Sequence, residues 1–222
     1  MTKNDKMVSL VKEPIGAPAK SRLFDLYSGD GYVYAFLRVR WWIADFEGVA
    51  KYVPESGTIV DLGCGYGIFA NYIAAASPDR NVIGIELSGR KLKYADKGLP
   101  NARFINDDIT RVADLPPCDC ILLLDVLHHL NSFEEQESLL RYCKGLLRPN
   151  GMILIKDIDK KPLHKFLFTR MVDNLLYPTC SYYYREENDF KALLGRLGFD
   201  VEFHAIAGTP YSNAAYLARN RA

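Results

Sequence analysis

The sequence predicts an α/β fold with a doubly wound, mostly parallel sheet that is completed by one reversed strand. From residue 57 onward, short β-branched and apolar runs alternate with helical patterns, which is typical of βαβ units. The last two apolar runs are separated by little more than a Gly-Thr-Pro turn. A parallel crossover needs at least about a dozen residues, so we expect these two final strands to pair antiparallel.

The strand signal is a short apolar run bounded by glycine, proline or polar residues. It occurs over 57–62, 81–87, 102–106, 120–126, 152–158, 201–207 and 213–219. The tripeptide Pro149-Asn150-Gly151 is expected to turn the chain into the fifth of these strands.

The helix signals lie between the strands. Residues 67–77 carry apolar side chains at helical spacing until a proline stops them. Ser88 opens a more polar helix, and Ser132 with Glu135 forms a capping box ahead of another. A final helix is expected near 186–197. Strands and helices in this alternation place helices on both faces of the sheet.

Length and composition limit the class of protein. A chain of 222 residues suits one domain over 1–222, and 28 Lys+Arg against 27 Asp+Glu gives a net charge of +1, which argues against a nucleic-acid partner. Five cysteines without a CxxC pair favour a reduced, intracellular protein with no zinc or other metal site. The N-terminus lacks the apolar core of a signal peptide, and no apolar run reaches about 18 residues. We therefore expect a cytoplasmic protein without a membrane span.

A glycine-rich turn follows the first strand and carries the strongest functional signal. It runs Asp61-Leu-Gly63-Cys64-Gly65-Tyr-Gly67, at the strand end where ligands bind in open α/β sheets. A dinucleotide fingerprint would place its third glycine at 68, which is isoleucine here. Glu86 ends the second strand and is able to accept both hydroxyls of a ribose. Together these features predict a ribose-bearing cofactor.

The combination of motifs resembles the class I S-adenosylmethionine-dependent methyltransferases. The strings that carry the resemblance are VDLGCGYG, GIEL, FINDDI, ILLLDVLHHL and LLRPNGMILI, and it covers about residues 55–220. It implies a Rossmann-like methyltransferase fold with a seven-stranded sheet whose last strand is antiparallel. It also implies methyl transfer from S-adenosyl-L-methionine.

The same resemblance implies a role for each cofactor residue. The glycine turn cradles the methionine part, the acid after the second strand holds the ribose, and the acid after the third strand contacts the adenine amino group. Aligned on the usual Gly-Asp pattern, Asp108 matches that last position and Asp107 stands where glycine is usual. The residues expected to bind the cofactor are Arg40, Asp61, Gly63, Cys64, Gly65, Gly67, Glu86, Leu87, Asp108, Ile109 and Asp125.

Two segments outside the motifs are expected to close the site. In relatives of this kind an N-terminal helix covers the cofactor, and a basic side chain on it pairs with the cofactor's carboxylate. The aromatic-rich segment at about 15–53 offers Arg38 and Arg40, of which we choose Arg40, and Tyr27, Tyr32 and Tyr34 are expected to line this lid. The alternative is a solvated face of an amphipathic helix.

The second segment is an insert at about 159–185 that would form the substrate wall. Its apolar residues are Leu163, Phe166, Leu167, Val172, Leu175 and Leu176, and its basic neighbours are Lys161, Lys165 and Arg170. An apolar or aromatic substrate, peripheral contact with a lipid surface, and ordinary packing on the core all suit this pattern. Aromatic residues make up 12% of the chain, and about half of them, Tyr177 included, lie in the two segments. This distribution favours an apolar, water-poor pocket.

Candidates for a catalytic base are few, because in-line methyl transfer needs alignment and at most one base. His128 and His129 follow the fourth strand and Asp157 ends the fifth, at the expected catalytic edge, with Asp157 and Lys156 pointing to opposite faces. The alternative is that the histidines only bind loop carbonyls. His204, within a late strand, is expected to be structural.

Four functions stay open. They are a methyltransferase acting on a small molecule, one acting on a macromolecule, a nicotinamide oxidoreductase, and a non-catalytic subunit that binds S-adenosylmethionine. The isoleucine at 68 argues against the oxidoreductase. The neutral charge, and the lack of a D/N-P-P-Y string at Asp125, argue against a nucleic-acid substrate. We favour a small-molecule methyl acceptor.

Overall fold

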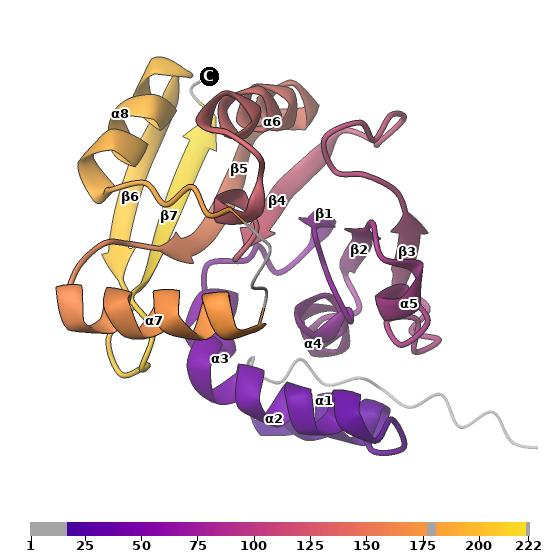
Figure 1. Ribbon diagram of the computed structural model, residues 1–222. Coiled ribbons are helices and arrows are strands. Elements are labelled where there is room, and N and C mark those ends of the chain that lie inside the picture. Colours follow the sequence, from indigo (N-terminus) through magenta and orange to yellow (C-terminus); the bar gives the residue numbers. More distant parts are fainter. Residues whose placement is uncertain (1–16, 177–180, 221–222) are drawn as a thin grey trace, which may run out of the picture.

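A computed structural model describes residues 17–176 and 181–220 (Figure 1). Its centre is a seven-stranded sheet in the order β3-β2-β1-β4-β5-β7-β6. The strands are β1 (Gly57–Leu62), β2 (Arg80–Glu86), β3 (Ala102–Asn106), β4 (Cys118–Leu124), β5 (Leu147–Ile158), β6 (Phe199–Ala205) and β7 (Asn213–Asn220).

The strand directions confirm the predicted fold class. The neighbours from β3 to β5 all pair parallel, whereas β7 is antiparallel to both β5 and β6. Chain order reverses between β1 and β4, and this switch point is where open α/β sheets bind ligands.

Helices cover both faces of the sheet, as the alternation predicted. They are α1 (Ala17–Tyr27), α2 (Tyr32–Ala44), α3 (Phe46–Ala50), α4 (Ile68–Ala76), α5 (Gly89–Leu92), the 3₁₀ turn η1 (Leu127–His129), α6 (Phe133–Leu146), α7 (Leu163–Leu176) and α8 (Glu187–Arg196). Residues of α6 and α8 share one buried cluster with the sheet, and residues of α1 to α4 share a second. The capping box forms: the Ser132 hydroxyl accepts the Glu135 N–H at 3.1 Å, and the Glu135 carboxylate accepts the Asn131 N–H.

The structure differs from the sequence-based boundaries around the fifth strand. Asn150 has a φ of 63°, as a turn residue would, but it lies inside β5, which begins at Leu147. The register against β4 shifts between Cys118 and Cys120. The predicted turn is therefore a bulge, because the residues ahead of it also pair with β4.

Within the described residues, no helix has both the length and the apolarity needed to cross a bilayer. Tyr177, part of the aromatic pattern of the insert, lies outside the described residues, as do the first two residues of the predicted lid segment. That residues 1–222 form one domain stays a prediction.

Candidate functional site

The glycine turn joins β1 to α4, and its three glycines all have positive φ, between 59° and 78°. A Cβ on Gly63 would lie 2.7 Å from Val126 Cγ2, and one on Gly67 would lie 2.7 Å from Ala95 Cβ. A Cβ on Gly65 would meet nothing within 4 Å. Packing thus requires glycine at positions 63 and 67, because a Cβ there would clash. At Gly65 the space next to the backbone is open.

Glu86 braces this turn from the end of β2. One carboxylate oxygen accepts the Gly65 N–H at 3.0 Å and the other accepts the Ser88 N–H at 2.8 Å. Each oxygen keeps a further lone pair, so the carboxylate is held in place and still has acceptor capacity for two hydroxyls. Leu87, the next residue, is exposed beside it.

Asp61 lies beneath the turn and is buried. Burial, together with the neighbouring charge of Glu86, raises the pKa of Asp61 to about 7. Cys64, also in the turn, is partly buried and free, and burial raises the pKa of its thiol, so it is a poor nucleophile. Both groups therefore have pKa values that burial raises.

Asp108 lies in the loop after β3, next to the partly buried Ile109. One of its oxygens accepts both the backbone N–H and the hydroxyl of Thr110, at 2.9 and 2.7 Å, and these hydrogen bonds lower the pKa of Asp108. Asp107 instead accepts the N–H of Asp108. The partly exposed, ionised carboxylate of Asp108 is thus the acceptor that an adenine amino group would require.

Asp125, just past β4, joins two cations from distant parts of the chain. Its carboxylate accepts from Arg40 Nη2 at 2.7 Å and from Lys156 Nζ at 2.7 Å. Burial alone would raise the pKa of Asp125, but the charges of Lys156 and Arg40 hold it below its ordinary value. Two cations around one carboxylate leave an excess of positive charge at this edge of the sheet.

The N-terminal helices cover the glycine turn. The Tyr27 hydroxyl donates to the Tyr66 carbonyl at 2.7 Å and accepts from the Asn71 amide at 2.8 Å. The hydroxyls of Tyr32 and Tyr66 lie 2.6 Å apart. Tyr34 does not reach the turn and packs edge-on against Phe24.

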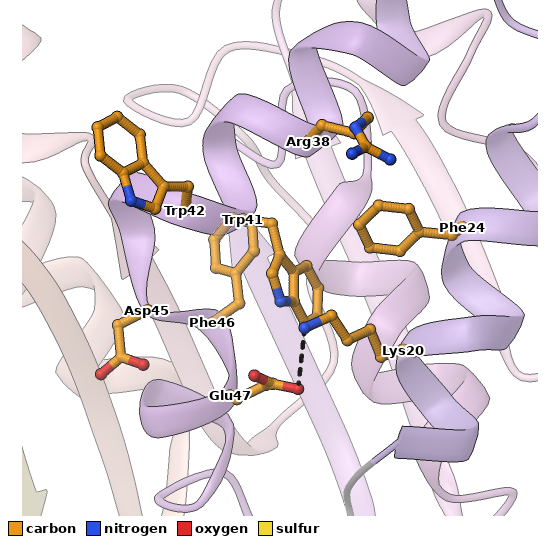
Figure 2. Close-up of a pocket in the computed structure, with 8 residues that line it drawn as sticks. All are labelled: Lys20, Phe24, Arg38, Trp41, Trp42, Asp45, Phe46 and Glu47. Atoms are coloured by element: carbon orange, nitrogen blue, oxygen red, sulfur yellow. Dashed lines mark ion pairs between the residues drawn. The ribbon is translucent and has the colours of Figure 1, made fainter. Parts of the chain in front are cut away.

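The two candidate arginines of α2 have different surroundings. Arg40 reaches Asp125, whereas Arg38 lines a separate cavity of about 500 Å³ on the outside of α1, α2 and α3. Figure 2 shows the residues of this cavity, with the Lys20–Glu47 ion pair at 3.6 Å. None of the residues expected to bind the cofactor lines this cavity.

The structure brings two of the three candidate catalytic residues into contact. His128 Nδ1 is hydrogen-bonded to the Asp157 carboxylate, and both side chains are buried. Burial alone would lower the pKa of His128, but Asp157 raises it above the ordinary value. His129 is exposed, with its ring centroid 4.1 Å from that of His128. As alternation predicted, Lys156 and Asp157 diverge, one toward Asp125 and the other toward His128.

Aromatic residues of the insert surround His128. Tyr184 stacks on its imidazole with a centroid distance of 5.3 Å, and Tyr182 stacks on Tyr184 at 5.7 Å. The Tyr184 hydroxyl donates to Asp173 of α7 at 2.7 Å. Sequence reasoning considered Lys156 only as one of two residues, with Asp157, of which one could face the substrate, and it assigned no role to Asp173. The sequence feature that could have identified Lys156 and Asp173 is a charged residue within an otherwise apolar segment.

The sheet order, the glycine turn at the switch point and the braced Glu86 together define a Rossmann-like methyltransferase fold of class I. The chain belongs to the methyltransferase family, because the family model described as "Methyltransferase domain" matches residues 35–203. S-adenosylmethionine is the cofactor of this class. The residues present fit it: open space adjoins Gly65, Glu86 keeps acceptor capacity, and Asp108 presents an ionised carboxylate.

Curated relatives match part of the chain. It is 32% identical over 111 residues to the trans-aconitate 2-methyltransferase of Klebsiella pneumoniae (strain 342), covering 49% of this chain and 43% of the relative. It is 27% identical over 132 residues to the ubiquinone biosynthesis O-methyltransferase of Paracidovorax citrulli, covering 56% and 50%. The chain thus spans about half the length of the curated relatives it matches.

Solved structures share the fold. The magnesium protoporphyrin IX methyltransferase of Synechocystis PCC 6803, with bound S-adenosylhomocysteine, superposes with a TM-score of 0.67 at 20% identity, covering 96% of this chain and 99% of that one. Human N-acetylserotonin methyltransferase, in complex with S-adenosylmethionine, gives a TM-score of 0.67 at 21% identity, covering 93% and 61%.

Proposed function

We propose that this protein transfers the methyl group of S-adenosylmethionine to a small molecule with an apolar or aromatic body. The observation that carries the proposal is the buried His128–Asp157 pair at the edge of the sheet, bordered by the rings of Tyr182 and Tyr184. Relatives named for trans-aconitate and for ubiquinone biosynthesis support a small acceptor. A cytoplasmic location and the lack of a nucleic-acid partner are parts of this proposal that rest on composition.

In this proposal the chain's own residues hold the cofactor at three points. The glycine turn, Glu86 and Asp108 bind its methionine, ribose and adenine parts. The Arg40–Asp125–Lys156 cluster faces the charged end of the methionine, where its excess positive charge suits a carboxylate. When bound, the cofactor supplies a methyl group on a positively charged sulfur.

His128 is the general base of the proposed reaction. Asp157 accepts the Nδ1 hydrogen of His128, which leaves Nε2 with a lone pair. A hydroxyl of the acceptor would give its proton to Nε2 as its oxygen forms a bond to the methyl carbon. The bond from that carbon to sulfur would break, with S-adenosylhomocysteine as the leaving group. Tyr184 acts through His128, because stacking on the imidazole limits its rotation.

The proposal is tested by the dependence of methyl transfer on pH and on His128. Apolar phenols serve as acceptors, and S-adenosylhomocysteine formation is measured. For an active acceptor, kcat/KM should rise with pH through an apparent pKa above the ordinary histidine value of about 6.5, because Asp157 raises it. His128→Gln should lower kcat by about 100-fold or more without changing the affinity for S-adenosylhomocysteine.

His129→Gln is the matched control and should retain turnover. Full turnover by His128→Gln would show that His128 is not a general base. Alignment of the two substrates would then be the mechanism. Calorimetric binding of NAD, without binding of S-adenosylhomocysteine, would overturn the proposed function as a whole.

A further inference from the structure

The outer face of α7 is apolar. Leu163, Leu167, Met171 and Leu175 follow one another at intervals of four residues and are between 54% and 78% exposed. At about 100° per residue, this spacing places them in one stripe along the helix. Phe168, also exposed, widens the stripe. We call these five side chains the α7 outer surface. In Figure 1, α7 lies below the arrowhead of β6.

The inner face of α7 combines apolar packing of Phe166 and Val172 with buried polar contacts. Thr169 is buried, and its hydroxyl donates to the Lys165 carbonyl and accepts the Ser212 N–H. Asp173 is buried and accepts from Tyr184. The helix thus buries a threonine and an aspartate while it exposes five large apolar side chains. Exposed apolar patches of this kind mark interaction sites in proteins.

The charges around α7 favour an anionic partner. Residues 160–185 contain five cations and a single carboxylate, Asp173, which is buried. Lys160 pairs with Glu186, Lys165 donates to the Thr209 carbonyl and Arg185 donates to Gln136, so these three are engaged within the protein. Lys161 and Arg170 are exposed at the flanks of the apolar stripe. A two-fold contact of this surface with a second copy would set cations against cations. An anionic lipid surface offers both apolar depth and negative charge.

We propose that the α7 outer surface docks on an anionic lipid surface. In this arrangement α7 lies in the plane of the interface, its apolar side chains enter the acyl boundary, and Lys161 and Arg170 contact lipid phosphates. The 14 residues of α7 are too few to cross a bilayer, which takes about 20 residues, so the contact is peripheral. This inference goes beyond the proposed function, since it does not depend on turnover.

The test is co-sedimentation of the full chain with vesicles of phosphatidylglycerol and phosphatidylcholine, and with vesicles of phosphatidylcholine alone. We expect binding to the mixed vesicles that weakens with salt. The double variant Leu167→Gln/Met171→Gln should lower the partition coefficient by about tenfold or more, given the apolar area that each side chain buries. Phe133→Gln, which alters an exposed apolar residue of α6, is the control and should bind as the wild type does.

Charge is tested in the same assay. Arg170→Glu should weaken binding to the mixed vesicles several-fold, whereas Arg141→Glu on α6 should have little effect. Equal binding by the wild type and the Leu167/Met171 double variant would overturn the proposal. A dimer of the wild type, detected by light scattering and absent in the double variant, would also overturn the proposal. The surface would then be a self-association site. All variants alter exposed side chains, and their thermal unfolding is compared with that of the wild type.

Discussion

Gly65 differs from its neighbouring glycines in what its missing side chain permits. All three adopt positive φ, but only at Gly65 does the space that a side chain would fill remain open. Gly67 lets α4 approach the chain at Ala95. A ligand could approach the backbone at Gly65 through this open space. Gly65 is therefore the position suited to ligand binding, whereas Gly63 and Gly67 are required by packing.

Substitution of Gly65 and substitution of Gly67 should therefore have different effects. Gly65→Ala should cost about 1–2 kcal/mol of unfolding free energy through backbone strain and lower the affinity for S-adenosylhomocysteine by about tenfold. Gly67→Ala should cost more stability, because strain is joined by a clash with Ala95. Urea denaturation and calorimetric titration measure the two quantities. Equal ligand affinity in Gly65→Ala and the wild type would show that the ligand does not approach this glycine.

Glu86 carries the second prediction at this scale. Glu86→Ala removes a charged acceptor and should weaken S-adenosylhomocysteine binding by about 1.5–3 kcal/mol. Because Glu86 also holds the N–H groups of Gly65 and Ser88, Glu86→Gln, which keeps one acceptor oxygen, should lose less. Glu137→Ala, on the surface of α6, is the control for calorimetry. An unchanged dissociation constant in Glu86→Ala would mean that the ribose lies elsewhere.

At the scale of elements, we propose that α2 covers the site and that α7 forms its wall. α2 contributes Arg40 to the cluster at Asp125 and Tyr32 to the glycine turn. α7 contributes Asp173, which fixes Tyr184 and through it the ring of His128. Both helices thus contact the Asp125 and His128 end of the sheet through residues that are far from it in sequence.

The two arginines of α2 allow a matched test of the cover. Arg40→Met removes a charge-assisted hydrogen bond to Asp125 and should weaken S-adenosylhomocysteine binding by about tenfold. Arg38→Met, two residues away and facing the outer cavity, should leave affinity unchanged. Both are measured by calorimetric titration. The same loss in both variants would point to a general effect on α2 and would contradict a specific role for Arg40.

At the scale of the whole molecule, the buried Asp61 makes stability depend on pH. Its pKa is raised from 3.8 to about 7 in the folded chain, so ionisation of this carboxyl opposes folding. This unfavourable contribution to the free energy of folding is absent below pH 3.8, the pKa of the carboxyl in the unfolded chain. It grows as the pH rises toward 7.

Asp61→Asn should flatten this dependence. When the pH is raised from about 5 to about 8, the free energy of unfolding of the wild type should fall by roughly 3 kcal/mol more than that of the variant. Urea denaturation of both proteins at the two pH values measures the difference, and charges common to both cancel. Parallel pH profiles would show that Asp61 is not the buried group responsible.

The sequence predicted the sheet and the glycine turn well because their signals are local. The apolar run 57–62, the glycines after it and the acid at the end of the next strand lie within 30 residues of one another. Errors arose where local signals were ambiguous. Pro149-Asn150-Gly151 has turn chemistry but lies within a bulged strand, since pairing with β4 decides which residues are extended.

The sequence alone determined the α/β class, the reversed last strand and the position of the glycine motif, because periodicity and connection length constrain these directly. Only the tertiary structure decided that Arg40 reaches Asp125 across 85 positions of sequence, that Asp157 meets His128, and that α7 turns its leucines outward. These contacts depend on how helices pack on a completed sheet. Phe166 and Leu167 are adjacent, similar apolar residues, yet the first is packed inside and the second is exposed. Thr169 and Asp173 anchor the other face of that helix to the protein.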